Sequence, residues 1–140
     1  MLNGTVVYVR EASVDVAEFK RVLQESGLDK VRPVGDERRL AALLRGANLI
    51  ITARLNTHDR ALVGIARCLT DSSWCCYVPD LAVSASAQGY GVGRALLDEI
   101  RRQLGPEVSI VLLSYPEAVR FYEKIGMARA PDAFCYQRER

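Results

Sequence analysis

Hydrophobic residues follow two different periods along the chain, one typical of strands and one typical of helices. Apolar runs of strand length occupy Thr5–Arg10, Leu49–Leu55, Ala61–Leu69, Trp74–Val83 and Val108–Leu113. Between these runs, apolar positions recur three and four residues apart, which places them on one side of a helix. The alternation of the two periods predicts a mixed α/β fold, with the three consecutive runs in the middle forming an antiparallel meander.

Helix signals mark the intervals between the strands. The first helix should start near Asp15, with Glu18 three residues later, and stop at Gly27. Further helices are expected after Gly35 or Asp36, from Arg94 to Gly105, and over Pro116–Gly126. The remaining stretch, Met127–Arg138, is interpreted as one or two strands. The predicted order is therefore β-α-α-β-β-β-α-β-α-β, with room for one more strand.

The composition fits one domain spanning residues 1–140. Hydrophobic residues make up 49% and charged residues 26%, which excludes disordered and collagen-like classes. The 19 basic and 17 acidic side chains are interspersed and give a formal charge of +2, so neither a nucleic acid nor a membrane is expected as partner.

The sequence also predicts where the protein is located and whether it binds a metal. No apolar run is long enough to span a membrane, and the first eight residues lack the pattern of a secretory signal. We therefore expect a soluble, cytoplasmic protein. One histidine and four cysteines without a Cys-x-x-Cys spacing argue against a zinc site, and no metal is expected.

The most informative segment is a glycine-rich turn, Gln88–Arg94, which follows a strand and opens a helix. Backbone N–H groups at a helix N-terminus have no partner within the helix, and the helix dipole adds partial positive charge there. Glycine lets a phosphate approach the backbone. The turn therefore predicts a diphosphate site, and a tight turn with glycines at positive φ is the alternative.

Two common nucleotide-binding motifs do not match this turn. The dinucleotide fingerprint is Gly-x-Gly-x-x-Gly with an acidic residue about 20 positions later. Here the glycines are Gly89, Gly91 and Gly93, and residues 109–113 read Ser-Ile-Val-Leu-Leu. The Gly-Lys-Ser/Thr of a P-loop is also missing. A nucleotide-binding α/β protein is therefore disfavoured.

Two motifs at a characteristic spacing resemble the GNAT superfamily of acetyl-CoA-dependent N-acetyltransferases. The first is Asp80–Val83 followed by Gln-x-x-Gly-x-Gly at Gln88–Gly93. The second, about 30 residues later, is Arg-Phe-Tyr-Glu-Lys-Ile-Gly-Met at Arg120–Met127. The resemblance is detailed from Cys75 to Met127 and covers the whole chain in element order. It implies a mixed, largely antiparallel central sheet flanked by helices.

The resemblance also implies where acetyl-CoA binds. Its pantetheine arm would lie along the strand ending at Val83, opposite the strand Val108–Leu113, and its diphosphate would lie in the glycine turn. Arg94 would add charge near the phosphates, with a solvated surface arginine as the alternative. The implied contacts with acetyl-CoA are Leu81, Ala82, Val83, Gln88, Gly89, Tyr90, Gly91, Val92, Gly93, Arg94 and Tyr122.

Acetyl transfer requires a deprotonated amine, a polarised thioester carbonyl and a proton for the departing thiolate. The resemblance assigns the last task to Tyr122 as general acid, with simple packing of its ring as the alternative. A backbone N–H in Leu81–Val83, where family members have a strand bulge, would polarise the carbonyl. Asp80 is the first candidate for general base, ahead of Glu117 and His58, and a chain of waters is a further alternative.

The chain departs from the family pattern at three places. Tyr115 stands where many relatives carry an asparagine that contacts the cofactor, Met127 replaces a usual phenylalanine, and Ser84–Ala87 lacks the common proline and charged residues. These differences do not remove the implied acetyl-CoA site. They discourage assignment to a subfamily.

The resulting hypothesis is an N-acetyltransferase that moves acetyl from acetyl-CoA directly to a primary amine in a ternary complex. A small amine is expected, such as a polyamine, an arylalkylamine or an amino sugar, because 140 residues leave little chain for a peptide groove. The alternatives are a non-catalytic module that senses acetyl-CoA or CoA, and a transferase that uses another acyl-CoA or a protein amine. The C-terminal strands or Thr5–Arg10 would supply the edge for a homodimer.

Overall fold

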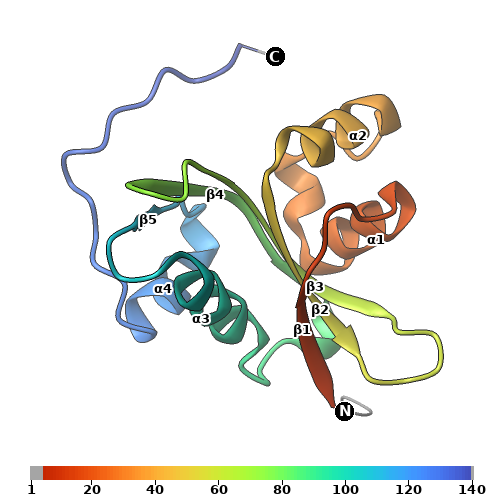
Figure 1. Ribbon diagram of the computed structural model, residues 1–140. Coiled ribbons are helices and arrows are strands. Elements are labelled where there is room, and N and C mark those ends of the chain that lie inside the picture. The colour runs from red at the N-terminus through yellow and green to blue at the C-terminus, as the bar shows by residue number, and fades with distance from the viewer. Residues whose placement is uncertain (1–4, 140) are drawn as a thin grey trace.

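The computed structural model describes residues 5–139. The expectation that the chain has no secretory signal rests in part on residues 1–4, which lie outside the described residues. One five-stranded sheet has the order β1-β2-β3-β4-β5 (Figure 1). Strands β1 to β4 are antiparallel neighbours, and β5 runs parallel to β4. Their bounds are β1 Val6–Arg10, β2 Leu49–Leu55, β3 Leu62–Thr70, β4 Cys75–Val83 and β5 Ser109–Val111.

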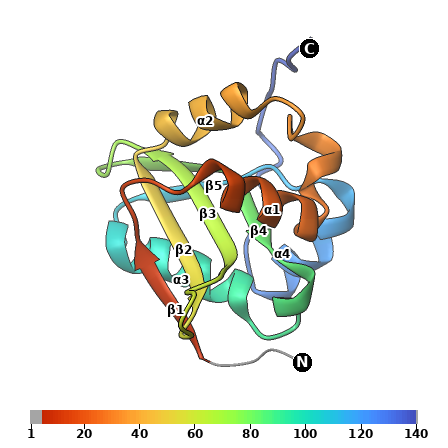
Figure 2. The same cartoon turned by 90° about the vertical axis from the view of Figure 1, so that its right-hand side faces the viewer.

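Helices cover both faces of the sheet (Figures 1 and 2). On one face lie α1 (Val16–Ser26) and α2 (Glu37–Gly46), whose apolar side chains form a core with alternate residues of the strands. On the other lie α3 (Val92–Leu104) and the short α4 (Val119–Lys124). Since each face of the sheet is covered, β2 and β3 are buried almost throughout. The predicted fold class is confirmed, as is the element order as far as α4.

Local signals at the helix ends explain most of the boundaries. Gly27 ends α1 with φ of 89°, a left-handed conformation that suits glycine. The Asp36 side chain accepts a hydrogen bond from Arg39 N at 3.1 Å and so caps α2. The expected capping pair at the start of α1 is wrong, because Asp15 makes no side-chain cap bond and Glu18 instead pairs with Arg54.

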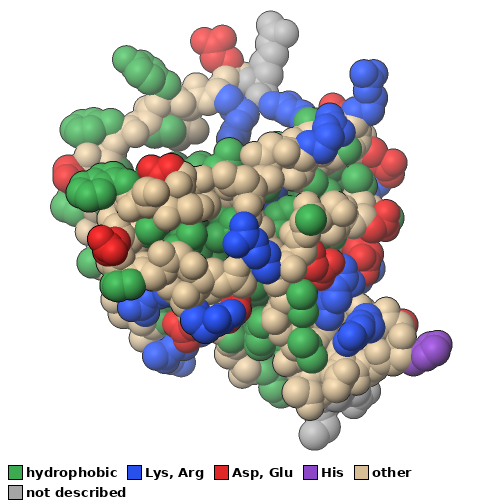
Figure 3. Space-filling model, in the orientation of Figure 1, with side chains coloured by type: hydrophobic (Ala, Val, Ile, Leu, Met, Phe, Trp, Pro, Cys, Tyr) green, Lys and Arg blue, Asp and Glu red, His purple; other side chains and the backbone are tan. Residues whose placement is uncertain are grey.

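The expected strands within Met127–Arg138 are also wrong. Residues 127–139 contain no strand, and Figure 1 shows this segment running away from the sheet after α4. Phe134 and Tyr136 are 96% and 104% exposed, and apolar side chains stand out along the segment in Figure 3. A strand needs a partner, but β5 is only three residues long and a turn closed by Ala133 N and Ala130 O breaks the segment.

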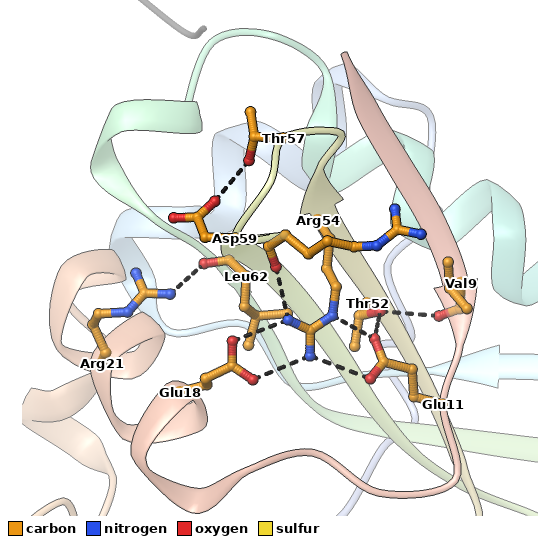
Figure 4. Close-up of polar contacts among 10 residues, drawn as sticks. Val9, Glu11, Glu18, Arg21, Thr52, Arg54, Thr57, Asp59 and Leu62 are labelled. Atoms are coloured by element: carbon orange, nitrogen blue, oxygen red, sulfur yellow. Dashed lines mark hydrogen bonds and ion pairs between the residues drawn. The ribbon is translucent and has the colours of Figure 1, made fainter. Parts of the chain in front are cut away.

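An ionic cluster on the α1 and α2 face connects β2 to α1 and to the segment between β1 and α1 (Figure 4). The Arg54 guanidinium contacts Glu11 at 2.7 Å and Glu18 at 2.9 Å, and Thr52 donates to Glu11. Burial alone raises the pKa of Glu11, but the hydrogen bonds from Arg54 and Thr52 outweigh it and leave that pKa below its ordinary value. Glu11 therefore stabilises the fold as a carboxylate.

Replacing Glu11 with glutamine should lower the free energy of unfolding by about 1.5–3 kcal/mol at neutral pH, the usual range for hydrogen bonds to a charged group. Because the folded pKa lies below the unfolded one, this contribution is present above the unfolded pKa and disappears as pH falls through the folded pKa. Urea unfolding at about pH 7 and about pH 3 measures the difference. Glu25→Gln, which breaks only an exposed pair with Arg21, is the control. An equal loss at both pH values would contradict the prediction.

Candidate active site

Strands β4 and β5 separate after a short pairing. The ladder joins Cys75–Tyr77 to Ser109–Val111 and then stops. Beyond Tyr77, no described residue pairs as a strand with the β5-facing edge of β4. This edge therefore offers backbone groups to a ligand, as the resemblance implied for a pantetheine arm.

The ladder on the other edge of β4 decides which backbone groups face the opening. Ser84 N donates to Val63 O at 2.8 Å, which fixes the alternation of hydrogen bonds between β3 and β4. In an antiparallel pair, successive residues direct their N–H and C=O groups to opposite edges. Ala82 therefore bonds toward β3, whereas Leu81 and Val83 present their backbone groups to the open edge.

Glycine is favoured in the turn for two different structural reasons. Gly89 and Gly91 adopt φ of 85° and 79°, and a Cβ there would meet nothing within 4 Å, so backbone conformation rather than crowding favours glycine. Gly91 is also the N-cap of α3. At Gly93 a Cβ would lie 2.9 Å from Phe121 Cζ, so the missing side chain lets α4 pack closely against α3.

A groove of about 530 Å³ runs between the open edge of β4, the glycine turn and α4. This size suits a small-molecule site. The groove brings together nine of the residues predicted from sequence: Leu81, Val83, Gln88, Gly89, Gly91, Val92, Gly93, Arg94 and Tyr122. Ala82, Tyr90 and Asp80 are not among its lining residues.

Individual side chains refine the predicted contacts. The Gln88 amide donates to Val83 O at 2.9 Å, so it closes the end of β4 instead of projecting freely. Arg94 is exposed and lies 3.9 Å from Asp98 on the same helix. Tyr90 is 53% exposed, whereas Ala82 is buried on the opposite side of the sheet, against the core of α1 and α2.

Tyr122 lies in the wall of the groove with its ring partly buried. It packs edge-on against Phe121, with ring centroids 5.0 Å apart. Burial first, and then the nearby Tyr115, raises the pKa of Tyr122 to about 12. The phenol therefore keeps its proton throughout the physiological range, which is the state that a general acid needs.

Asp80 does not face the groove. Its carboxylate is fully buried, and its two oxygens contact Arg32 Nε and Arg67 Nε, each at 2.5 Å. Because this carboxylate is buried between two guanidinium groups and does not line the groove, it does not reach an amine bound there. The other two candidates for the base are both exposed. His58 lies on the loop after β2, where it projects from the surface in Figure 3, and it does not line the groove. Glu117 does line the groove.

Sequence reasoning missed the end of the groove formed by the α1 side of the molecule. Ser26 and Leu28, which flank the stop of α1, line it together with Tyr115. Leu28 carries no motif, and its only signal is its place directly after Gly27. Tyr115 stood out in the sequence as a departure from the family pattern, and its ring packs against the core of α1 and α2.

A larger hollow, of about 880 Å³, lies along α3 and the residues that follow α4. Its walls carry Arg101 and Arg102 but neither the glycine pair of the turn nor Tyr122. Size alone does not indicate chemistry. The smaller groove combines a proton donor, an open strand edge and a helix N-terminus, so it is the candidate active site.

Comparison with known families agrees with this geometry. The model of the acetyltransferase (GNAT) domain family matches residues 34–137. The chain belongs to the GNAT acetyltransferase family. It is accordingly an acyltransferase, and its family uses acetyl-CoA as donor and amines as acceptors.

Relatives of this GNAT protein differ in what they are named for. An uncharacterized N-acetyltransferase, ycf52, of Porphyra purpurea is 27% identical over 86% of this chain and 68% of its own length. Serotonin N-acetyltransferase 2 of Oryza sativa subsp. japonica is 30% identical over 94% of this chain and 65% of its own length. Histone acetyltransferase TAP1 of Glycine max is 27% identical over 93% of this chain and 60% of its own length.

Solved structures share the fold at lower identity. A GNAT family acetyltransferase of Streptococcus pneumoniae TIGR4 has a TM-score of 0.68 and 20% identity, covering 96% of this chain and 100% of its own. An aminoglycoside acetyltransferase from an uncultured soil metagenomic sample has a TM-score of 0.69 and 19% identity, and the match covers 96% of this chain and 97% of that chain. Among residues 5–139, no helix combines the length and apolar character that crossing a membrane requires.

Proposed function

We propose that this GNAT enzyme transfers acetyl from acetyl-CoA directly to a primary amine of a small molecule within a ternary complex. The observation that carries the proposal is the position of Tyr122, which shares one groove with the open edge of β4 and the glycine turn. A protonated phenol beside the N–H groups of Leu81 and Val83, which face the open edge of β4, meets two of the three chemical needs of acetyl transfer.

The residues of the groove fit acetyl-CoA, which supplies an activated acetyl thioester when bound. Gly89 and Gly91 leave the N-terminus of α3 open to a diphosphate. Leu81 and Val83 would hold the pantetheine arm through their backbone groups, as an added strand does. Arg94, at the edge of the groove, is proposed as a further phosphate contact.

Each chemical task then has a proposed residue. Tyr122 would give its proton to the departing thiolate, and a backbone N–H beside the open edge of β4 would polarise the thioester carbonyl. Glu117 replaces Asp80 as our candidate for the base, because it lines the groove and forms no ion pair with another described residue, whereas Asp80 is buried between arginines. A water chain to solvent remains the alternative route for that proton.

The acceptor end of the groove favours a small amine. Ser26, Leu28 and Tyr115 form its wall, a mixture of apolar, aromatic and hydroxyl groups that suits a ring-bearing or aliphatic amine. Of the similar proteins above, one is named for serotonin and one for aminoglycosides, which are small amines, and one is named for histones. The cytoplasmic location and the homodimer stay predictions.

A thiol-release screen tests the proposal. The protein is incubated with acetyl-CoA and, separately, with an arylalkylamine, a polyamine, an aminoglycoside and a lysine-containing histone peptide. We expect CoA release with at least one small amine and weaker release with the peptide. Preference for the peptide would overturn the small-molecule assignment, and tight acetyl-CoA binding without any release would favour the sensor alternative. Faster release from propionyl-CoA than from acetyl-CoA would point to another acyl donor.

A further inference from the structure

A β-bulge interrupts β4 just before the stretch that borders the groove. Arg67 of β3 faces Asp80, whereas Leu69 faces Tyr77, so β4 holds one more residue than β3 over this interval. The extra residue falls at positions 78–79, where a proline, which has no N–H to contribute to a ladder, is well accommodated. The bulge was expected within Leu81–Val83, and it lies earlier.

The bulge determines which side chains and backbone groups reach the groove. Before it, Val78 packs toward α3, and after it Leu81 and Val83 do so. Asp80 and Ala82 face the α1 and α2 side instead. Without the extra residue the two pairs would exchange faces and edges, because side chains alternate with a period of two. The open edge of β4 is therefore correctly oriented only while the bulge is kept.

One side chain reaches the bulge from the other side of the sheet. Arg32 follows the 3-10 helix Leu28–Val31, and its Nη2 donates to Pro79 O while its Nε donates to Asp80 Oδ1, both at 2.5 Å. The second oxygen of Asp80 is held by Arg67, which also donates to Leu43 O of α2 at 3.2 Å. The bulge is thus fixed to β3, to α2 and to the segment between α1 and α2.

We propose that Arg32 is a positioning residue for acetyl transfer, acting through the bulge at Pro79 and Asp80. This inference rests on the proposed function. By holding one backbone carbonyl and one carboxylate of adjacent residues, the guanidinium keeps the bulge in a single arrangement. That arrangement directs the N–H groups of Leu81 and Val83 to the groove, although Arg32 does not line the groove itself.

The geometry requires arginine in particular. A planar guanidinium presents two parallel N–H donors, whereas a lysine ammonium is a single point of charge and cannot reproduce this fork. Placement of donors at a reacting centre is demanding, and a shift of about 1 Å costs roughly 100-fold in rate. Loss of the fork should therefore reduce turnover more than it reduces the affinity for acetyl-CoA, whose diphosphate is held by the separate glycine turn.

The test compares Arg32→Gln and Arg32→Lys with Arg21→Gln. Arg21 is a matched control, because it too donates from the α1 and α2 side to a strand carbonyl, Leu62 O at 2.6 Å, and does not line the groove (Figure 4). Three quantities are measured: kcat with the best amine of the screen, the acetyl-CoA Kd by calorimetry, and hydrogen exchange at the Leu81 and Val83 amides.

We expect both Arg32 variants to lower kcat by roughly 10- to 100-fold, with the acetyl-CoA Kd changed less than about threefold and exchange at the two amides altered. Arg21→Gln should leave all three near the values of the unmodified protein. Unchanged kcat and unchanged exchange in Arg32→Gln, or equal effects in Arg21→Gln, would overturn the inference. If the unmodified protein transfers acetyl to no amine, the proposed function fails, and the exchange measurement still decides whether Arg32 holds the bulge.

Discussion

Replacement of Tyr122 by phenylalanine should lower kcat by about 100-fold or more, the usual contribution of a positioned general acid. The change removes one hydroxyl and keeps the ring, so the edge-on contact with Phe121 persists. Acetyl-CoA affinity should stay close to that of the unmodified enzyme, since the glycine turn and the open edge of β4 are untouched. Steady-state kinetics with a fixed amine, together with calorimetry, measure both effects.

The pH dependence gives this prediction a second test. Burial raises the pKa of Tyr122 to about 12, and a general acid works while it is protonated, that is, below its pKa. The unmodified enzyme should therefore show no decline in kcat between about pH 7 and about pH 10 that is caused by Tyr122. Above that range, deprotonation should reduce kcat, and Tyr122→Phe should lack this alkaline decline.

Tyr136→Phe is the matched control, because that ring is fully exposed on the C-terminal segment. It should leave kcat and its pH profile unchanged. If Tyr122→Phe is as active as the unmodified enzyme at every pH, Tyr122 only packs, and the proton for the thiolate comes from water. That result would remove the general acid from the proposed mechanism while leaving the acetyl-CoA site intact.

Features encoded by a few neighbouring residues could be predicted from the sequence. The stop of α1 at Gly27 and the cap of α2 by Asp36 depend on backbone preferences and hydrogen bonds within one turn. The same holds for the turn that opens α3, where Gly89 and Gly91 must adopt positive φ. These local signals, combined with hydrophobic periodicity, were sufficient to place most of the sheet and its helices.

Features that depend on a distant partner could not be predicted in this way. The expected C-terminal strands failed because alternating apolar residues form a strand only where another strand pairs with them. Asp80 was taken for a base because it adjoins the cofactor strand, yet a single extra residue at the bulge turns it to the opposite face. Its two arginine partners lie 48 and 13 positions away along the chain, so no local pattern announced them.

Asp80→Asn distinguishes between Asp80 as the general base and Asp80 as a structural support of the bulge. The substitution keeps the shape of the side chain but leaves Arg32 and Arg67, whose side chains are 22% and 8% exposed, without the charge that balances them. Removing one partner from a buried ionic group typically costs about 3–5 kcal/mol. For a chain of this size that loss corresponds to a fall in Tm of roughly 10–17 °C.

The matched control is Asp98→Asn, which removes an exposed carboxylate that lies 3.9 Å from Arg94. Exposed pairs of this kind contribute less than about 1 kcal/mol, so its Tm should stay almost unchanged. Thermal unfolding of the two variants beside the unmodified protein measures the difference. If Asp80 were the general base, its replacement would reduce kcat and alter the acid side of the pH profile without lowering the Tm. A large fall in Tm, with the shape of the pH profile preserved in the folded variant, assigns Asp80 to the support of the bulge and leaves Glu117 or water to accept the proton of the amine.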